Sequence, residues 1–349
     1  MTRSAKTGER AVVSLLMKWF DRNKREMPWR GESDPYRIWV SEVMLQQTQV
    51  ATVIDYYNRW LAAFPTVETL AAAEPDAVLK RWEGLGYYSR ARNLHRAAKL
   101  VADKGGRFPQ TFDGWRALPG IGDYIAAAVT SIANAEPVGV VDGNTARVFS
   151  RRFAIETPVS TSAFRADIRS KIESGFGGRH PGWINQAWME FGALQCKPSP
   201  DCSVCPLASN CAAKQTGRAS QFPVKTKKAA VPVRKGAIYV IRRRDKTLLV
   251  RRPQQGLLGG MWELPNGLFD ETPERDFLAS RKLKSGKTLG AVSHAYSHFK
   301  VEYAVKDAKL NGGWLDDDGT ESRWLTDTEI NALPRPKVTL LALDIIRTQ

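Results

Sequence analysis

Apolar residues recur at helical spacing through roughly the first two hundred residues of the chain. Between Arg10 and Phe20 the valine, leucine and aromatic positions are three and four residues apart, as on one face of a helix. Similar patterns continue to about residue 195, and alternation typical of strands is nearly absent there. Residues able to cap the next helices precede each pattern: Thr48, Thr66, Asp76 and Ser89. The pattern predicts an all-α first part.

The apolar pattern changes its period after the last cysteine. Residues 236–242 and 247–252 alternate and are separated by a short polar turn, which predicts a hairpin. Residues 299–305 alternate in the same way. Thr326 to Glu329 has the form of a capping box, and residues 338–346 predict a closing helix. The second part is therefore expected to be α+β.

The stretch between these two parts has the composition of a connector. Residues 215–235 contain six basic residues, two prolines and no acid, which is typical of an extended, solvated segment. With 349 residues, two domains are the natural expectation. The predicted organisation is a loose tail over 1–9, a helical domain over 10–214, a linker over 215–235 and a second domain over 236–349.

Charge and composition narrow the classes of partner. Lysine and arginine outnumber the acids 52 to 36, a formal charge of +16, which favours a polyanion such as nucleic acid. Ribosomal and membrane-associated proteins share this property. No apolar run is long enough to span a membrane, and the first residues lack the apolar stretch of a signal peptide. We expect a soluble, cytoplasmic or otherwise intracellular protein, a monomer with no membrane partner.

The only four cysteines lie close together, at Cys196, Cys202, Cys205 and Cys211. Such clustering is a poor way to cross-link a chain of this size with disulfides. Four thiolates in one short loop instead predict a structural metal site. The spacing alone does not distinguish zinc from a [4Fe-4S] cluster.

Glu42 is predicted to lie on an apolar helix face. Asp34 can cap that helix and Pro35 suits its first turn. Counting three and four residues from Glu42 reaches a mostly apolar set with one amide: Ile38, Trp39, Leu45 and Gln46. Its pKa is therefore expected to be raised towards the range of a general acid or base. The alternative is a helix whose glutamate simply faces solvent.

Leu118-Pro119-Gly120-Ile121-Gly122 lies between two predicted helices. Glycines in a tight loop expose backbone amides, and the next helix adds its positive end, so Gly120 and Gly122 are candidates to hold a DNA phosphate. The alternative is an ordinary turn between helices.

Asp142 follows an apolar run and precedes Gly143 and Asn144. We expect its carboxylate at the end of a buried segment, where Asn144 could hydrogen-bond it. A turn that merely caps a helix is the alternative. Together with a buried Glu42, Asp142 would complete the pair of carboxyl groups that cleavage of a glycosidic bond requires.

Several longer motifs resemble adenine DNA glycosylases of the MutY family, within the helix-hairpin-helix superfamily that includes endonuclease III. The resemblance covers residues 10–215 closely and the remainder more loosely. The matching stretches are Met27-Pro28-Trp29-Arg30, residues 41–50, Gly84 to Tyr88, the hairpin at 118–122, Asp142-Gly143-Asn144, Asn185-Gln186-Ala187 and the cysteine cluster. The family usually has six residues between its first two cysteines, and this chain has five.

The resemblance implies roles for individual residues. Glu42 would be the general acid that protonates adenine N7, and Asp142 the carboxylate that stabilises the sugar cation or briefly bonds C1′. Tyr124 and Asn144 would support that pair. The adenine pocket would include Trp29, Arg30, Leu45 and Glu190. Gln47 and Tyr87 would enter the duplex, where they offset the stacking lost when a base is turned out. The metal would be a [4Fe-4S] cluster.

The second domain resembles the family's Nudix-like reader of 8-oxoguanine. Residues 259–265 resemble the Nudix sheet, but the acidic metal-binding box is absent, so pyrophosphate hydrolysis is not expected. Tyr296, Ser297 and His298 align with the family's Phe-Ser-His loop, which touches the oxidised guanine. Taken alone, this stretch would be the start of a strand with one polar histidine.

The function expected from these features is removal of adenine mispaired with 8-oxoguanine or guanine in base excision repair. Relatives that also cleave the strand carry a lysine where this chain has Tyr124, so base removal by water alone is expected. A replication or repair protein could dock on the linker. The alternatives are a related glycosylase acting on another base, or an iron-sulfur protein that only binds DNA or senses redox state.

Overall fold

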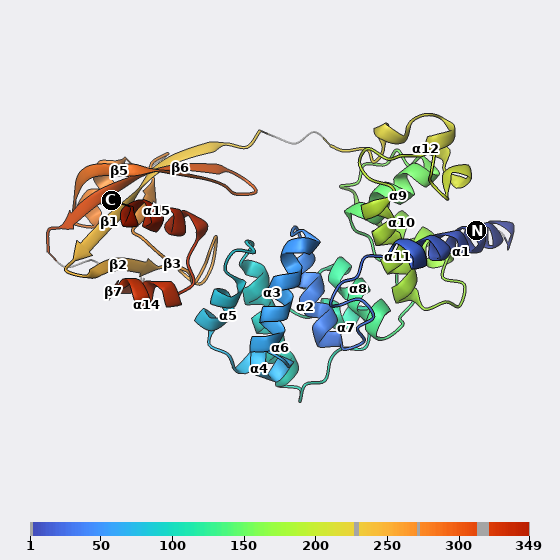
Figure 1. Ribbon diagram of the computed structural model, residues 1–349, viewed down its shortest axis with the longest axis horizontal. Coiled ribbons are helices and arrows are strands. Elements are labelled where there is room, and N and C mark those ends of the chain that lie inside the picture. The colour runs from blue at the N-terminus through green and yellow to red at the C-terminus, as the bar shows by residue number, and fades with distance from the viewer. Residues whose placement is uncertain (1–2, 227–229, 271–272, 313–320, 349) are drawn as a thin grey trace. The chain divides into compact units, whose positions relative to one another are not determined.

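The computed structural model describes residues 3–226, 230–270, 273–312 and 321–348, with side chains described from Gly8 onward. The chain forms two compact units (Figure 1). The first comprises Met1–Ala71 and Arg96–Lys228, and the second comprises Ala72–His95 and Ala229–Gln349. Ala72–His95, which the sequence analysis assigns to the helical domain, therefore belongs to the same compact unit as the C-terminal domain.

The first unit is built from helices, as the apolar pattern predicts. Their bounds are α1 (Arg3–Asn23), α2 (Pro35–Leu45), α3 (Val50–Ala63), α4 (Val67–Ala72), α6 (Ser89–Ala102), α7 (Phe112–Arg116), α8 (Asp123–Ala133), α9 (Gly143–Phe153), α10 (Ser162–Ser174), α11 (Pro181–Leu194) and α12 (Ala212–Gln215). Helices α4 and α6 continue across the boundary into the second unit. Two short 3-10 turns cover Ala208–Asn210 and Ala219–Gln221.

Three sequence predictions about helix starts are wrong. Asp76 does not precede a helix, because α5 (Pro75–Trp82) begins at Pro75 and Glu74 occupies its cap position. The predicted tail over 1–9 is helical from Arg3, because α1 extends beyond the apolar positions that begin at Val12. Thr48 does not cap the next helix: α3 begins at Val50, and Gln49 occupies the cap position without a side-chain hydrogen bond.

Apolar faces of α1, α9, α10 and α11 meet in one core of the first unit. Phe20, Phe149, Ile168 and Ile184 are all fully buried in this core. Burial of such side chains stabilises the fold by roughly 1.5–3 kcal/mol each. The partly buried Cys196 and Cys205 pack against it, so the cysteine loop rests on the same core as α9 and α11.

A seven-stranded sheet forms the body of the second unit. The strands are β1 (Val233–Arg243), β2 (Lys246–Arg251), β3 (Trp262–Glu263), β4 (Asn266–Leu268), β5 (Leu283–Ala295), β6 (Lys300–Leu310) and β7 (Ser322–Leu325). The order is β3-β2-β1-β6-β5, with β4 beside β1 and β7 beside β2. The predicted hairpin is confirmed, because β1 and β2 pair antiparallel through Arg242 and Thr247.

Helices α13 (Glu274–Ser280), α14 (Asp327–Ala332) and α15 (Lys337–Arg347) accompany the sheet. The predicted capping box is confirmed, since the Thr326 and Glu329 side chains each accept from the other's backbone amide. Val338 and Ile346 of α15 are buried in a core with Val301 and Val305 of β6. The alternation seen in the sequence is the inward face of this strand.

Helix α5 (Pro75–Trp82) and the first turns of α6 belong to the second unit through specific contacts. Arg251 of β2 pairs with Asp76 at 2.5 Å, and Trp262 Nε1 donates to the same carboxylate at 3.3 Å. The Arg335 amide donates to Glu83 at 2.8 Å. These polar contacts join segments about 170 or more residues apart.

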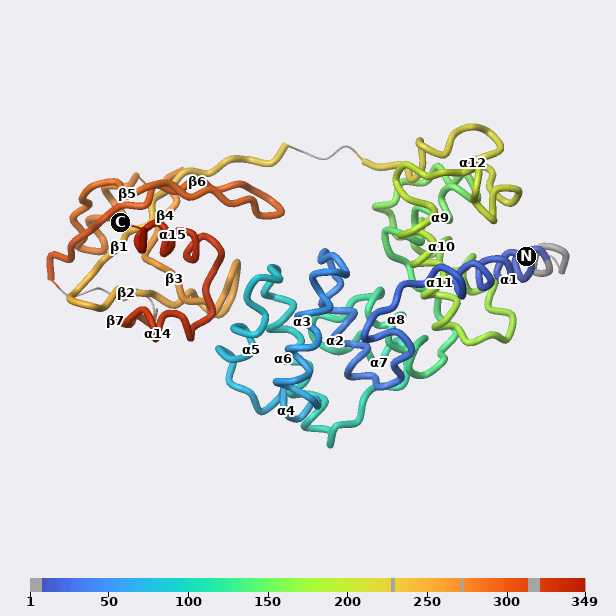
Figure 2. The backbone as a smooth tube through the Cα atoms, in the orientation of Figure 1, coloured from blue at the N-terminus to red at the C-terminus, as the bar shows by residue number. Residues whose placement is uncertain are grey.

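The predicted linker is shorter than its composition suggests. Phe222 is buried, and Arg151 Nε donates to the carbonyls of Ala219 and Phe222 at 2.8 and 3.3 Å. The Val159 amide donates to the Val224 carbonyl. The first half of the stretch therefore packs on the helical unit, as the backbone trace of Figure 2 lets the reader follow, and β1 already begins at Val233.

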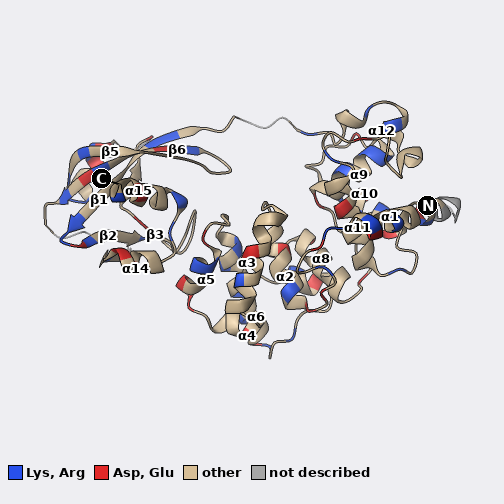
Figure 3. Cartoon of the chain, in the orientation of Figure 1, with Lys and Arg blue, Asp and Glu red and all other residues tan. Residues whose placement is uncertain are grey.

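In the described part of the chain, no helix is long and apolar enough to cross a membrane. Basic positions occur in both units (Figure 3).

Candidate active site

Glu42 is buried inside α2. The Asp34 side chain accepts the Tyr36 amide at 2.8 Å and so caps this helix, as the sequence predicts. Glu42 is only 5 % exposed. Its Oε2 accepts a hydrogen bond of 2.5 Å from the Tyr124 hydroxyl, which α8 supplies just after the glycine hairpin.

Burial raises the pKa of Glu42 to about 7. The hydrogen bond from Tyr124 and the charge of Arg30 act in the opposite direction, while the nearby Asp142 raises the pKa further. A carboxyl group with this pKa can be protonated near neutral pH and can give up that proton, which is the requirement for a general acid.

Asp142 caps α9 and accepts three hydrogen bonds. Its Oδ1 accepts from the amides of Asn144 and Thr145 at 3.0 and 2.7 Å, and its Oδ2 accepts from Asn144 Nδ2 at 2.9 Å. Burial raises the pKa of Asp142, and these bonds oppose the rise. The bonds favour the charged carboxylate and fix its orientation.

Glu42, Asp142, Tyr124 and Asn144 all line one cavity of about 520 Å³. This volume is within the range of small-molecule sites. Two carboxyl groups that are a hundred residues apart in the sequence therefore open into the same space. Such an arrangement can protonate a leaving group and stabilise a cation within a single site.

The wall of the cavity also includes Trp29, Arg30, Leu45 and Glu190. Arg30 donates to Glu190 at 3.2 Å, and Arg25 binds the same carboxylate through its backbone and its guanidinium at 2.8 to 2.9 Å. Burial opposes ionisation of Glu190, but the bonds from Arg25 and the charge of Arg30 outweigh it and lower its pKa. Glu190 is thus a fixed anion in this wall.

Several residues at this site were not predicted as site residues from the sequence. Arg25, Gln186 and Met189 line the cavity, and Gln186 accepts from Arg30 at 2.7 Å. Arg147 donates to Asn144 Oδ1 at 2.9 Å and to the Cys196 carbonyl at 2.7 Å. A sequence signal existed only for Gln186 and Arg147, which lie one helical turn from Glu190 and Asn144.

The glycine hairpin lies directly before α8. Gly120 has a φ of +74°, and no atom lies within 4 Å of the position a Cβ would take at Gly122. Leu118 and Ile121 are buried and anchor the loop. Asp123, the first residue of α8, pairs with Arg116 at 2.8 Å and Arg169 at 3.6 Å.

Comparison with known proteins identifies the family. The HhH-GPD superfamily base excision DNA repair model matches residues 40–174, and the NUDIX domain model matches residues 237–344. The adenine DNA glycosylase of Homo sapiens is 34 % identical over 92 % of this chain and 71 % of its own length. That of Rattus norvegicus is 36 % identical over 85 % of this chain and 70 % of its own length.

The chain belongs to the adenine DNA glycosylase family. Members of this family hydrolyse N-glycosyl bonds in base excision repair, so the chain is an enzyme that acts on DNA.

Solved structures support the fold of the helical part. A thermostable thymine-DNA glycosylase matches 61 % of this chain and 99 % of its own chain, with 26 % identity and a TM-score of 0.55. A trapped endonuclease III–DNA covalent intermediate matches 61 % of this chain and 98 % of its own, with 23 % identity and a TM-score of 0.53. The latter likeness shows the helix-hairpin-helix fold alone.

Gln47 and Tyr87 share an unusual backbone conformation. Both have a positive φ, 57° and 47°, although neither is glycine. This left-handed conformation costs roughly 1–2 kcal/mol for a residue with a Cβ. Neither residue lines the cavity wall described above. Strained positions of this kind often occur at functional loops of an enzyme.

Tyr87 and Ser297 come together within the second unit. Their hydroxyl oxygens are 2.7 Å apart, and both side chains are exposed. The sequence singled out these residues separately, from motifs two hundred residues apart. Tyr296 is half-buried against His294 and Phe299, and burial raises its pKa, while His298 is exposed.

Two acids of the Nudix-like domain are paired within the protein. Glu274 of α13 accepts from Lys306 at 2.7 and 3.0 Å and from Tyr239 at 2.7 Å. The buried Glu263 accepts from Arg252 at 2.7 and 3.0 Å. Each of these two carboxylates therefore has a cationic partner within the domain.

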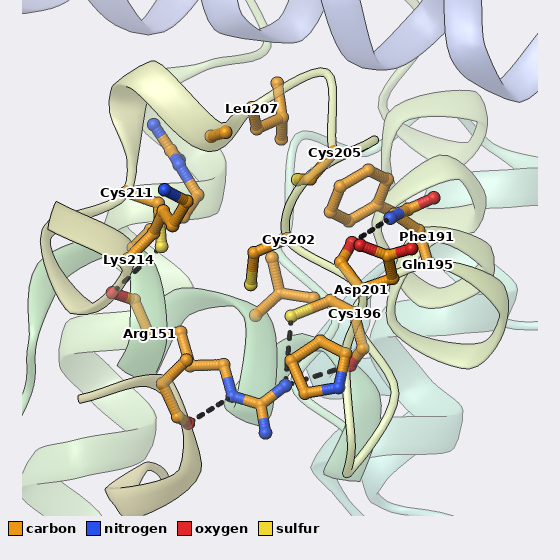
Figure 4. Close-up of a pocket in the computed structure, with 15 residues that line it drawn as sticks. Arg151, Phe191, Gln195, Cys196, Asp201, Cys202, Cys205, Leu207, Cys211 and Lys214 are labelled. Carbon is orange, nitrogen blue, oxygen red and sulfur yellow. Dashed lines mark hydrogen bonds between the residues drawn. The ribbon is translucent and has the colours of Figure 1, made fainter. Parts of the chain in front are cut away.

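All four cysteines line one small cavity of about 30 Å³ (Figure 4). They are free thiols, each partly buried. Arg151 reaches the rim, where it donates to Cys196 Sγ at 3.4 Å and to the Lys197 carbonyl at 2.6 Å. Four thiols around one cavity, with a cation beside them, are the donor set of an anionic metal-thiolate centre. Among the described residues, however, no three His, Cys, Asp or Glu side chains are grouped so as to hold a metal ion.

Proposed function

We propose that this enzyme removes adenine paired with 8-oxoguanine, or with guanine, from duplex DNA by hydrolysis alone. The observation that carries the proposal is the cavity in which buried Glu42 and Asp142 meet. The target nucleotide would be turned out of the duplex, because its glycosidic bond is inaccessible inside the stack.

In this mechanism Glu42 gives its proton to adenine N7. The electrons of the glycosidic bond leave with the base, and a cation develops at C1′ of the sugar. The Asp142 carboxylate, held by Asn144 and Thr145, stabilises that cation until water adds. Tyr124 orients Glu42 and offers no amine that could attack the sugar, so strand cleavage is not expected.

The other site residues bind the substrate. Trp29, Arg30, Leu45 and Glu190 would enclose the adenine, and the hairpin at Gly120 and Gly122 would hold a phosphate. Gln47 and Tyr87 would enter the duplex. Tyr296, Ser297 and His298 would contact the oxidised guanine on the opposite strand, and the hydroxyl contact between Tyr87 and Ser297 supports this joint role.

The four cysteines would hold a [4Fe-4S] cluster. When bound, this group would fix the loop of Cys196 to Cys211 and present its basic residues to DNA. The visible absorption of the purified protein, together with its iron and sulfide content, distinguishes this cluster from zinc.

A base-release assay tests the proposal. Duplexes with A opposite 8-oxoguanine, A opposite guanine, A opposite cytosine, and thymine glycol opposite adenine are compared under single-turnover conditions. We expect free adenine from the first two and an intact strand afterwards. Release of thymine glycol, or strand cleavage without added base, would favour the endonuclease III type instead.

Glu42→Gln separates an enzyme from a protein that only binds DNA. The variant is expected to bind the mismatched duplex and to lose base release by a factor of about 10²–10⁴, the usual contribution of a general acid. Glu26→Gln is the matched control, since Glu26 is exposed and lies outside the cavity lining. An unchanged rate in Glu42→Gln would refute the assignment.

A further inference from the structure

The segment that carries Asp142 into the cavity joins α8 to α9 and belongs to no sheet. Residues 135–142 run between α8 and α9 without helix or strand. Val138 and Val140 are buried against Ala127 and Ala128 of α8. The intervening residue points the other way, as in a strand, and the segment therefore needs partners for its backbone groups.

Gly139 allows close contact on the opposite side. A Cβ at this position would lie 2.9 Å from the Arg169 carbonyl and 3.1 Å from the Ile172 Cβ, both on α10. The segment is therefore enclosed between α8 and α10, and small displacements of it meet packed atoms on both sides.

The side chain of Asn185 makes the hydrogen bonds to this segment that a neighbouring strand would make in a sheet. Its Oδ1 accepts from the Val140 amide at 3.0 Å, and its Nδ2 donates to the Val138 carbonyl at 2.9 Å. Asn185 is fully buried on α11. One side-chain amide thus pairs with residues i and i+2 as a backbone amide unit would.

A second side chain holds the other edge of the segment. The Gly139 amide donates to Glu173 Oε1 at 3.0 Å. Three consecutive residues of the segment, 138 to 140, are consequently hydrogen-bonded to α10 and α11 by side chains alone.

We propose that Asn185 is a positioning residue for Asp142, with Glu173 in a lesser role. The bonds from Asn144 and Thr145 set the orientation of the Asp142 carboxylate relative to α9. The hydrogen bonds from Asn185 and Glu173 to residues 138–140 fix the position of that carboxylate relative to α8. Helix α8 carries Tyr124, which donates a hydrogen bond to Glu42. The proposal rests on the role of Asp142 at the sugar cation.

The test is the affinity for two duplexes that differ only in charge at the sugar. One carries a neutral tetrahydrofuran abasic residue at the target position, and the other carries a cationic pyrrolidine analogue. The wild-type protein is expected to prefer the cation, and Asp142→Asn is expected to lose that preference. Moving a carboxylate from about 4 to about 5 Å from a cation reduces the preference about fourfold at an effective dielectric of about 20.

The preference of Asn185→Ala for the cationic duplex over the neutral one is therefore expected to be about fourfold weaker than that of the wild-type protein. Its affinity for the neutral duplex should be unchanged. Its single-turnover rate should fall by about 100-fold, the usual effect of misplacement by about 1 Å. Ile184→Val is the matched control, because Ile184 is the preceding residue of α11 and is equally buried. This change removes one methyl group from the helical core and leaves both side-chain hydrogen bonds of Asn185 in place, so the variant should keep both the preference and the rate.

Glu173→Ala and Glu173→Gln provide a second pair that does not depend on the folding of Asn185→Ala. Alanine removes the acceptor for the Gly139 amide and should lower both the rate and the preference. Glutamine retains an acceptor oxygen and should restore them.

Two results would overturn the proposal in different ways. If the wild-type protein prefers the cation and Asn185→Ala and Glu173→Ala keep the full preference, the positioning role is wrong and the role of Asp142 stands. If neither the wild-type protein nor Asp142→Asn distinguishes the duplexes, the assignment of Asp142 is wrong as well.

Discussion

The hydrogen bond from Tyr124 to Glu42 opposes the effect of burial on the pKa of Glu42. Burial raises the pKa of Glu42 to about 7, and the Tyr124 hydroxyl moderates the rise because it stabilises the carboxylate. The reactive form is the protonated acid. The rate of base release should therefore be highest below about pH 7 and fall as the pH rises above it.

Tyr124→Phe should shift that fall to higher pH. Removing the hydroxyl removes an interaction that lowers the pKa of Glu42, so the acid stays protonated over a wider range. Single-turnover rates between pH 5 and pH 9 would show the shift. A fall displaced towards lower pH would contradict this account of the hydrogen bond.

The same carboxyl group affects stability. The pKa of Glu42 is higher in the folded protein than its ordinary value of 4.5, so the native state binds more protons than the unfolded state between these values. Stability is lost as the pH rises from about 4.5 to about 7. Glu42→Gln should thus raise the melting temperature at pH 8 but not at pH 4, which thermal unfolding at the two pH values would show.

The position of Asn144 in the site depends on the close packing of α11 on α9. A Cβ at Gly192 would lie 2.6 Å from the Asn144 Cβ and 2.9 Å from its backbone. Gly192→Ala should therefore displace Asn144 and the carboxylate it holds, with a loss of roughly 1–3 kcal/mol of stability from overpacking and a reduced rate of base release.

Gly8→Ala is the control for that substitution. No atom lies within 4 Å of a Cβ at Gly8 of α1, so alanine should stabilise the helix slightly. Melting temperatures and single-turnover rates of both variants would be compared. Gly192→Ala with wild-type activity would show that the two helices can separate without moving the site.

The sequence predicted elements well where local patterns determine them. Glu42, Asp142 and the capping box at Thr326 could be predicted because helix caps and apolar periodicity are local. The role of Arg25 could not be predicted, because it binds Glu190 across 165 residues. Asn185 was noted only as part of a motif, since its function depends on a segment contributed by another part of the chain.

Structure predicted from composition is wrong where tertiary contacts override local preferences. The charge and prolines of residues 215–235 predict an extended linker, yet Phe222 is buried against the helical unit. Strand β5 was missed because Gly286, Lys287 and Gly290 interrupt any apolar alternation, and β6 imposes its extended conformation through pairing.

At the scale of the whole molecule, the charge of +16 should govern DNA affinity. Each phosphate neutralised by a basic side chain adds about 0.9 to the slope of log affinity against log salt. Lys214→Ala, in the loop of the cysteines, should lower that slope by about 1. Gly120→Ala should weaken binding without changing the slope, because the hairpin offers amides rather than cations.

Fluorescence titrations of an abasic duplex at several salt concentrations would measure these slopes. Gly120 has a φ of +74°, so alanine strains the hairpin while the overall charge stays the same. An equal change of slope in both variants would contradict the distinction between cationic and amide contacts.

The Asp76 carboxylate accepts hydrogen bonds from Arg251 and Trp262, which lie 175 or more residues further along the chain. Selection therefore acts on these positions jointly: loss of the Asp76 carboxylate leaves the Arg251 guanidinium with Glu321 as its remaining ion-pair partner, and a reciprocal exchange can restore the lost pair. Across related sequences, substitutions at 76 and 251 should covary, and a laboratory variant at either position should resemble one at the other.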